Sequence, residues 1–248
     1  MKRFAILAIS AWSSLSFMVA QEMVTVDLHH AWVGCVPGDT ACPGDESPGG
    51  EVAFTPFAID AYEVTVGEYR RFAAATGKVL PPQPPGSNDR YPVVNVSHGE
   101  ATAFCAYLGK RLPTEAEWEA AARGNLQGSI YPWPGPPTND LGNFSGLGGK
   151  DRFPGLAPVG SFAPNSLGLF DMAGNVWEWV ADDYLPKPPS SQAAAKGGKL
   201  NVVKGGAWNS PFPSLRISNR GRLPADTDSE TVGFRCAGEN QQKAPEAS

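Results

Sequence analysis

The chain has 248 residues, a net charge of −5, 28 glycines, 24 prolines and seven tryptophans. This length suits one sizeable domain, and because no basic stripe is present, we expect no nucleic-acid partner. Glycine and proline make up about a fifth of the chain, which favours a loop-rich globular protein, and the tryptophans argue against general disorder.

The N-terminus has the pattern of a secretory signal. Lys2 and Arg3 precede an apolar stretch over residues 4–20, which serines interrupt and which is rather short for a membrane span. We therefore predict a cleaved signal peptide at residues 1–20. The mature protein is expected to be secreted or periplasmic, with no membrane insertion after signal cleavage.

Three helices are predicted by one repeated start signal, a capping box in which a hydroxyl at the N-cap is followed by glutamate three positions later. Each signal leads into a glycine of the kind that ends helices. Glu115, Glu117 and Glu119 of the third helix are expected to be capping and surface groups. The three boxes with their glycines are Thr65–Glu68 with Gly77, Ser97–Glu100 with Gly109, and Thr114–Glu117 with Gly124.

Short extended segments are expected between long loops. The regions 125–158 and 185–200 are predicted to be loop, the second a mobile surface insert rich in proline, serine and glycine. We expect one domain over residues 21–238 and a disordered polar tail at 239–248. The extended segments are predicted at residues 23–26, 52–57, 158–162, 202–205 and 232–236.

The four cysteines all lie beyond the predicted signal, in a part of the chain where disulfides persist after export. Cys35 and Cys42 share one glycine- and proline-rich loop and could close a small ring, which leaves Cys105 and Cys236 as a long-range pair. Four cysteines allow three connectivities, so the pairing stays open at this point. Disulfides are preferred over metal ligation because no Cys-x-x-Cys motif occurs and the three histidines are scattered.

Two loop segments are rich in side-chain oxygens. One contains Asn143 and Asp151, and the other contains Asp171, Asn175 and Glu178. Long loops in a compact domain need to be held in place, and calcium does this with six to eight oxygens in flexible geometry. The alternative is that these are ordinary Asx-turns and a buried, hydrogen-bonded acid.

Several sequence blocks resemble the formylglycine-generating enzyme family, also called the sulfatase-modifying factor domain. The block Gly168-Leu-Phe-Asp-Met-Ala-Gly-Asn-Val-Trp-Glu-Trp is the most distinctive of them. The resemblance implies an α+β, C-type-lectin-like fold with little regular secondary structure, three main short helices and small antiparallel sheets. The other blocks, in the family's order, are residues 61–69, 92–97, 109–119, 131–133, 157–160, 204–208 and 233–236.

The resemblance also implies two calcium sites by position. In each site two residues contribute side-chain oxygens and two contribute backbone carbonyls. The first set is Asn143, Phe144, Asp151 and Phe153, and the second is Asp171, Gly174, Val176 and Glu178.

The family's catalytic residues do not carry over. Formylglycine-generating enzymes resemble this chain in scaffold, but they oxidise a substrate cysteine with oxygen and a copper ion held by two cysteines. Soft thiolates suit Cu(I), whereas here the first position falls at Asn209 or Ser210 and the second near Ser214 or Leu215. The nearby serine of the family is Ala207. Copper is therefore not expected.

The resemblance assigns the cysteine pairs as well. Relatives with two bridges in this region would place the second at Ala122 and about Arg220, so both of its partners are absent together. The other bridge corresponds to Cys105–Cys236, and Cys35–Cys42 is then a local addition.

Two classes of function follow. The first is an exported, calcium-stabilised protein without oxidase chemistry that binds a peptide, glycan, small-molecule or protein partner in the former active-site groove. The second is a periplasmic enzyme of different chemistry, for example in siderophore maturation; formylglycine generation itself is less expected. Arginines in the groove could grip an anionic group, or Arg222 and Arg235 could be structural ion-pair partners. The groove candidates are Trp208, Asn209, Ser210, Ser214, Arg216, Asn219, Arg220 and Arg222.

Overall fold

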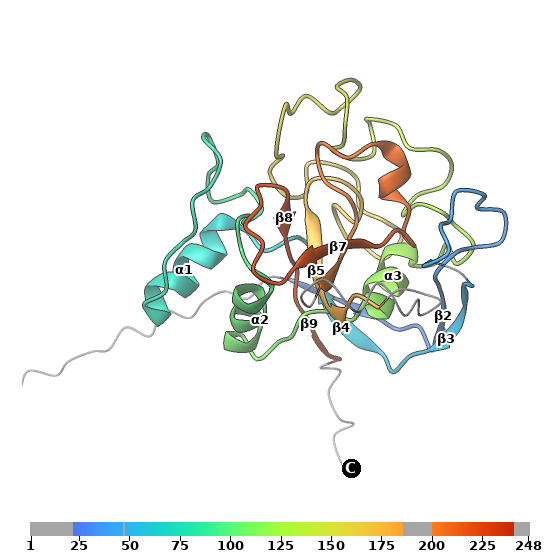
Figure 1. Cartoon of the computed structure of the whole chain (residues 1–248), viewed down its shortest axis with the longest axis horizontal. Coiled ribbons are helices and arrows are strands. Elements are labelled where there is room, and N and C mark those ends of the chain that lie inside the picture. The colour runs from blue at the N-terminus through green and yellow to red at the C-terminus, as the bar shows by residue number, and fades with distance from the viewer. Residues whose placement is uncertain (1–21, 47, 186–199, 241–248) are drawn as a thin grey trace, which may run out of the picture.

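The three predicted helices are present in the computed structural model, which describes residues 22–46, 48–185 and 200–240 (Figure 1). They are α1 (Val66–Thr76), α2 (His98–Tyr107) and α3 (Glu115–Arg123). Each begins with the predicted capping box, because the N-cap hydroxyl accepts the N3 backbone N–H and the N3 glutamate accepts the N-cap N–H. None of the described helices combines the length and apolar character that crossing a membrane requires.

Nine short strands form three small sheets in the described residues. The largest sheet has the order β7-β6-β5-β8 and is antiparallel apart from the β5–β8 pair. A second has the order β1-β4-β9, and β2 pairs with β3. The strands are β1 (Met23–Val26), β2 (His30–Val33), β3 (Gly50–Ala53), β4 (Phe57–Asp60), β5 (Trp177–Asp183), β6 (Leu200–Lys204), β7 (Gly221–Pro224), β8 (Val232–Gly233) and β9 (Ala237–Glu239).

The strand predictions were partly wrong. The segment 23–26 is confirmed, and 202–205 overlaps β6. The predicted strand at 52–57 instead spans the break between β3 and β4, and the segment 232–236 contains β8 but runs on into the gap before β9. The predicted strand at 158–162 is a turn in which Gly160 has a φ of 73°. Strands β2, β5, β7 and β9 were missed; β5 shows no clear alternation because three consecutive residues from Glu178 to Val180 are buried.

The large sheet lies between the helices (Figure 1), with α1 and α2 on one side and α3 with the β2–β3 pair on the other. Trp118 of α3 and Trp179 of β5 are fully buried and belong to two neighbouring core clusters. The Cys105–Cys236 disulfide joins α2 to the segment that leads into β9. The α+β prediction, with three short helices and small sheets, is confirmed.

Most of the loop at 125–158 contains no helix or strand, as predicted. The predicted signal peptide at 1–20, nearly all of the predicted insert at 185–200 and most of the predicted tail at 239–248 lie outside the described residues. The boundaries of the domain at 21–238 stay predictions.

Candidate functional site

The loop after β6 contains the positions assigned to the copper ligands. Gly205 and Gly206, with φ of 94° and 78°, turn the chain away from the sheet. Ser210 is 6% exposed, and its hydroxyl accepts the backbone N–H of Ala207 at 3.0 Å. The Ser210 carbonyl accepts the N–H of Ser145 at 3.0 Å. Of the two candidates for the first copper position, Asn209 is exposed and Ser210 is a buried serine that stabilises its own turn.

Of the two candidates for the second copper position, Ser214 is half-buried and Leu215 has a fully buried aliphatic side chain. Leu215 ends the short 3₁₀ helix Phe212–Leu215 and is fully buried against Phe144 and Ala173. A Cβ atom built at Gly206 would lie 3.6 Å from the Ser210 Cβ and 2.8 Å from a Leu215 methyl group. The side chains of Ser210 and Leu215 therefore both lie beside Gly206. All four cysteines of the chain lie elsewhere, in the Cys35–Cys42 and Cys105–Cys236 disulfides.

Arg216, a groove candidate, points into the protein rather than into a groove. Its two terminal nitrogens donate to the carboxylate of Glu46 at 2.5 and 2.7 Å, and one of them also donates to Asp39 at 3.1 Å. Arg216 is 5% exposed and Glu46 is 3% exposed. The guanidinium that could have gripped an anionic ligand is thus engaged by carboxylates of the loop at 34–46.

A second ion-pair cluster lies beside the first. Arg220 donates to both carboxylate oxygens of Glu115 at 2.7 and 3.0 Å, and Lys204 donates to Glu119 at 2.8 Å. The prediction that Glu115 and Glu119 are surface groups was wrong, because both are buried and paired with cations from other segments. Glu117 is the capping residue that the sequence indicated. Helical pattern alone could not show which cations would reach this face of α3.

The two clusters line a recess of about 160 Å³. Its walls come from α3, from the end of β5, and from Val33, Gly34, Asp45, Glu46, Pro48, Ser218 and Arg220. Five carboxylates and Arg220 line this acidic recess, and three of the carboxylates, those of Glu46, Glu115 and Glu119, are paired with cations. Burial and the neighbouring Glu115 carboxylate raise the pKa of Asp182, which lies in its wall.

The remaining groove candidates are spread over different environments. Trp208 is half-buried against the Val94, Leu156 and Val176 cluster. Asn209 is exposed, Ser214 is half-buried, and Asn219 donates to the Ser214 carbonyl at 2.9 Å. Arg222 is exposed on β7 and lies over the ring of Tyr184. The structure therefore does not bring the eight candidates together into one groove.

The first predicted calcium site has unused buried oxygens. Asn143 and Asp151 are each 1% exposed. The side-chain oxygen of Asn143 and one carboxylate oxygen of Asp151 accept no hydrogen bond from the residues that the structure describes. Buried oxygens of this kind normally have partners, and a hard cation is one that both could share. The donor set therefore fits calcium.

The second predicted site is built differently. Glu178 accepts two hydrogen bonds from Arg235, at 2.7 and 2.8 Å, and one from the Trp118 indole at 2.8 Å. This confirms the interpretation of Arg235 as an ion-pair partner. Asp171 instead accepts the N–H of Gly160 at 2.7 Å, although its charge still interacts with both Arg235 and Glu178. Because Arg235 and Trp118 already donate to Glu178, a cation at this site would find better ligands in Asp171 and nearby carbonyls than in Glu178.

A further acid, Glu63, belongs to the same buried cluster, although sequence reasoning missed it. It accepts the side-chain N–H of Asn175 at 2.6 Å. Burial is the main cause that raises the pKa of Glu63 well above its ordinary value, and the Asp171 carboxylate adds to it. Burial likewise raises the pKa of Asp171 to about 6. In the described part of the chain Arg235 faces all three carboxylates of the cluster, which leaves an excess of negative charge.

The two sites are joined by backbone contacts. The N–H of Asn175 donates to the carbonyl of Asn143 at 2.8 Å, and a Cβ at Gly174 would lie 2.1 Å from that same carbonyl oxygen. Gly174, with a φ of 89°, is therefore required for close packing of the two loops.

Comparison with known proteins identifies this scaffold. The sulfatase-modifying factor enzyme 1-like domain matches residues 19–240, which is most of the chain. The chain belongs to this family. Since the match covers both loop sites, the recess and the segment after β6, all of these features lie within the family domain.

The relatives include proteins named formylglycine-generating enzymes and proteins named as inactive forms of that enzyme. The chain is 36% identical to the inactive C-alpha-formylglycine-generating enzyme 2 of Mus musculus, over 77% of this chain and 78% of that protein. It is 33% identical to the formylglycine-generating enzyme of Thermomonospora curvata, over 82% and 91%. Among solved structures, PvdO from Pseudomonas aeruginosa has a TM-score of 0.75 and 31% identity, over 89% of this chain and 95% of that chain.

Proposed function

We propose that the protein is an exported, calcium-stabilised member of its family that lacks the copper oxidase site and binds a peptide, glycan or protein partner. The observation that carries the proposal is the pair of side chains at the copper positions. Ser210 is a buried turn-forming serine and Leu215 is a buried core residue. Neither can supply the soft ligand that Cu(I) requires.

Calcium is supported by the first loop site more than by the second. Asn143 and Asp151 offer buried oxygens without partners among the described residues. Calcium bound there would join the ends of a glycine-rich loop and link it, through the Asn143 carbonyl, to the loop that contains Asn175. At the second site the excess negative charge around Asp171 favours a cation, although Arg235 already neutralises part of it.

Export is supported by the cysteines. The two disulfides together use all four cysteines of the chain, and such bonds persist in oxidising compartments. The apolar stretch behind Lys2 and Arg3 would be the export signal.

Partner binding is supported by what remains around the former active site. Asn209 is exposed there, and Trp208 and Ser214 are half-buried, so polar and aromatic groups still face outward. Arg216 and Arg220 are excluded as anion-gripping groups because carboxylates already engage them. The partner is therefore expected to be recognised by hydrogen bonds and stacking more than by arginine clamps.

A restoration experiment tests the proposal. Purified mature protein and the Ser210→Cys/Leu215→Cys variant are compared for bound copper and for aldehyde formation on a sulfatase-type cysteine peptide under oxygen. We expect no copper and no aldehyde with the native chain, and copper binding by the variant, because both side chains lie beside Gly206. Stoichiometric copper and aldehyde product with the native chain would overturn the proposal. Turnover of another substrate by copper-free protein would favour the enzyme alternative.

A further inference from the structure

The two disulfides of this protein lie in very different surroundings. Cys105 and Cys236 are fully buried within the main core cluster. Cys35 and Cys42 are half-buried and close a loop in which they are only seven positions apart. A reductant can therefore approach the second disulfide without opening the core, whereas the first is protected by packing.

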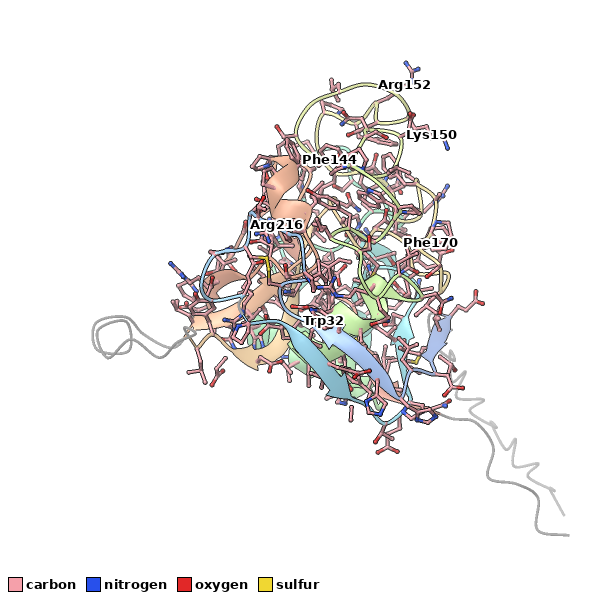
Figure 2. The ribbon with its side chains drawn as sticks, turned by 90° about the vertical axis from the view of Figure 1, so that its right-hand side faces the viewer. Trp32, Phe144, Lys150, Arg152, Phe170 and Arg216 are labelled. Carbon is pink, nitrogen blue, oxygen red and sulfur yellow. A yellow bond between two sulfur atoms is a disulfide. The ribbon has the colours of Figure 1, made fainter. Side chains whose placement is uncertain are left out.

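One side chain contacts the half-buried Cys35–Cys42 disulfide directly. A terminal nitrogen of Arg216 lies 3.6 Å from the Cys42 sulfur (Figure 2). Hydrogen bonds to Glu46 hold this guanidinium in place. The contact is thus a fixed feature of the loop and not a passing approach of a mobile side chain.

The two sulfurs differ in the groups that they face. Cys42 faces the N–H of Arg216, which can donate to a thiolate. The Cys35 sulfur lies 3.7 Å from the carbonyl oxygens of Val36 and Asp39, which disfavour negative charge. The carboxylates of Asp39 and Glu46 oppose a thiolate as well, but each is paired with the same guanidinium. The direct contact therefore makes Cys42 the better leaving sulfur.

We propose that Cys35–Cys42 is a thiol–disulfide exchange site for a dithiol reductant. The first thiolate of the reductant attacks the Cys35 sulfur, forming a mixed disulfide and releasing Cys42 as a thiolate that Arg216 stabilises. The second thiol of the reductant, as its thiolate, then attacks the reductant's own sulfur in the mixed disulfide and releases Cys35 as a thiolate. Two electrons pass to the protein, which gains two thiols, and the reductant leaves as a disulfide.

Opening this disulfide has a local structural consequence. The loop at 35–46 supplies Asp39 and Glu46 to Arg216, and Asp45 and Glu46 to the wall of the acidic recess. With the covalent link broken, Glu46 keeps its hydrogen bonds from Arg216 and Ser218, and Asp45 keeps the hydrogen bond from the Tyr184 hydroxyl. Exchange at Cys35–Cys42 thus removes the covalent constraint on the loop beside the recess and leaves the core disulfide intact.

Timed alkylation tests the proposal. Folded protein is treated with dithiothreitol, quenched with an alkylating agent and digested, and each cysteine is quantified by mass spectrometry. We expect Cys35 and Cys42 to be labelled at least about tenfold faster than Cys105 and Cys236, which serve as an internal control for unfolding. Similar rates for the two pairs in folded protein would overturn the proposal.

Two further measurements examine the role of Arg216. With glutathione, which has one thiol, the trapped mixed disulfide is expected mainly at Cys35, and a majority at Cys42 would contradict the assigned direction. In Arg216→Met we expect exchange to slow by about three- to tenfold, with the rate restored in Arg216→Lys. Arg220→Met, which alters the neighbouring cluster, is the matched control. If Arg216→Met instead unfolds the chain, Cys105 and Cys236 become labelled together with the other pair. In that case the position of the mixed disulfide with glutathione alone tests the role of Arg216.

Discussion

Replacing Arg216 by methionine should destabilise the protein strongly. The substitution leaves the Glu46 carboxylate, which is 3% exposed, without its bidentate partner, and it also removes the contact to Asp39. Removing one partner of a buried ion pair lowers the free energy of unfolding by about 3–5 kcal/mol. For a domain of this size that corresponds to a fall in Tm of roughly 6–20 °C.

The assay is urea unfolding followed by tryptophan fluorescence, with Arg222→Met as the matched control. Arg222 is exposed on β7, so its loss should cost less than about 1 kcal/mol. A double-mutant cycle with Glu46→Met should show a coupling of at least about 1 kcal/mol, because the double variant no longer contains the Glu46 carboxylate that the single variant leaves unpaired. If Arg216→Met were as mild as Arg222→Met, Arg216 would not be a structural residue, and the anion-binding hypothesis for it would return.

Three more substitutions probe other parts of the molecule. Asp151→Asn should abolish the rise in Tm that calcium produces in chelator-treated protein, because a ligand stabilises only through the site it binds, and an unchanged rise would place calcium elsewhere. Tyr69→Phe should be neutral or stabilising by about 1 kcal/mol, because the buried hydroxyl has no partner among the described residues. Burial raises the pKa of Tyr69 from 10.0 to about 12, so the native protein should lose stability as pH rises from 10.0 towards 12, a loss that the phenylalanine variant should not share in urea titrations. Leu215→Ala should cost about 2–5 kcal/mol in the same titrations, and a cost near zero would mean that the copper position is open rather than filled.

Local signals in the sequence determined the helices and the family. Each helix begins where a hydroxyl and a glutamate satisfy each other's backbone N–H groups, and that pattern acts over three residues whatever surrounds it. The absence of cysteine at the copper positions could also be read from the chain alone. The oxygen-rich loops were visible as sequence clusters, and the orphaned oxygens of Asn143 and Asp151 now give the first of them a physical basis.

The tertiary structure alone decided which charged groups face one another. Glu46 and Arg216 are 170 positions apart, and Glu178 and Arg235 are 57 apart, so no local pattern relates them. Buried charges are stable only when paired, and the fold determines the partner of each one. For that reason Glu119 is a buried partner of Lys204 rather than a surface group. For the same reason Arg216, chosen from the sequence as a ligand-binding residue, instead holds a disulfide-closed loop against the protein.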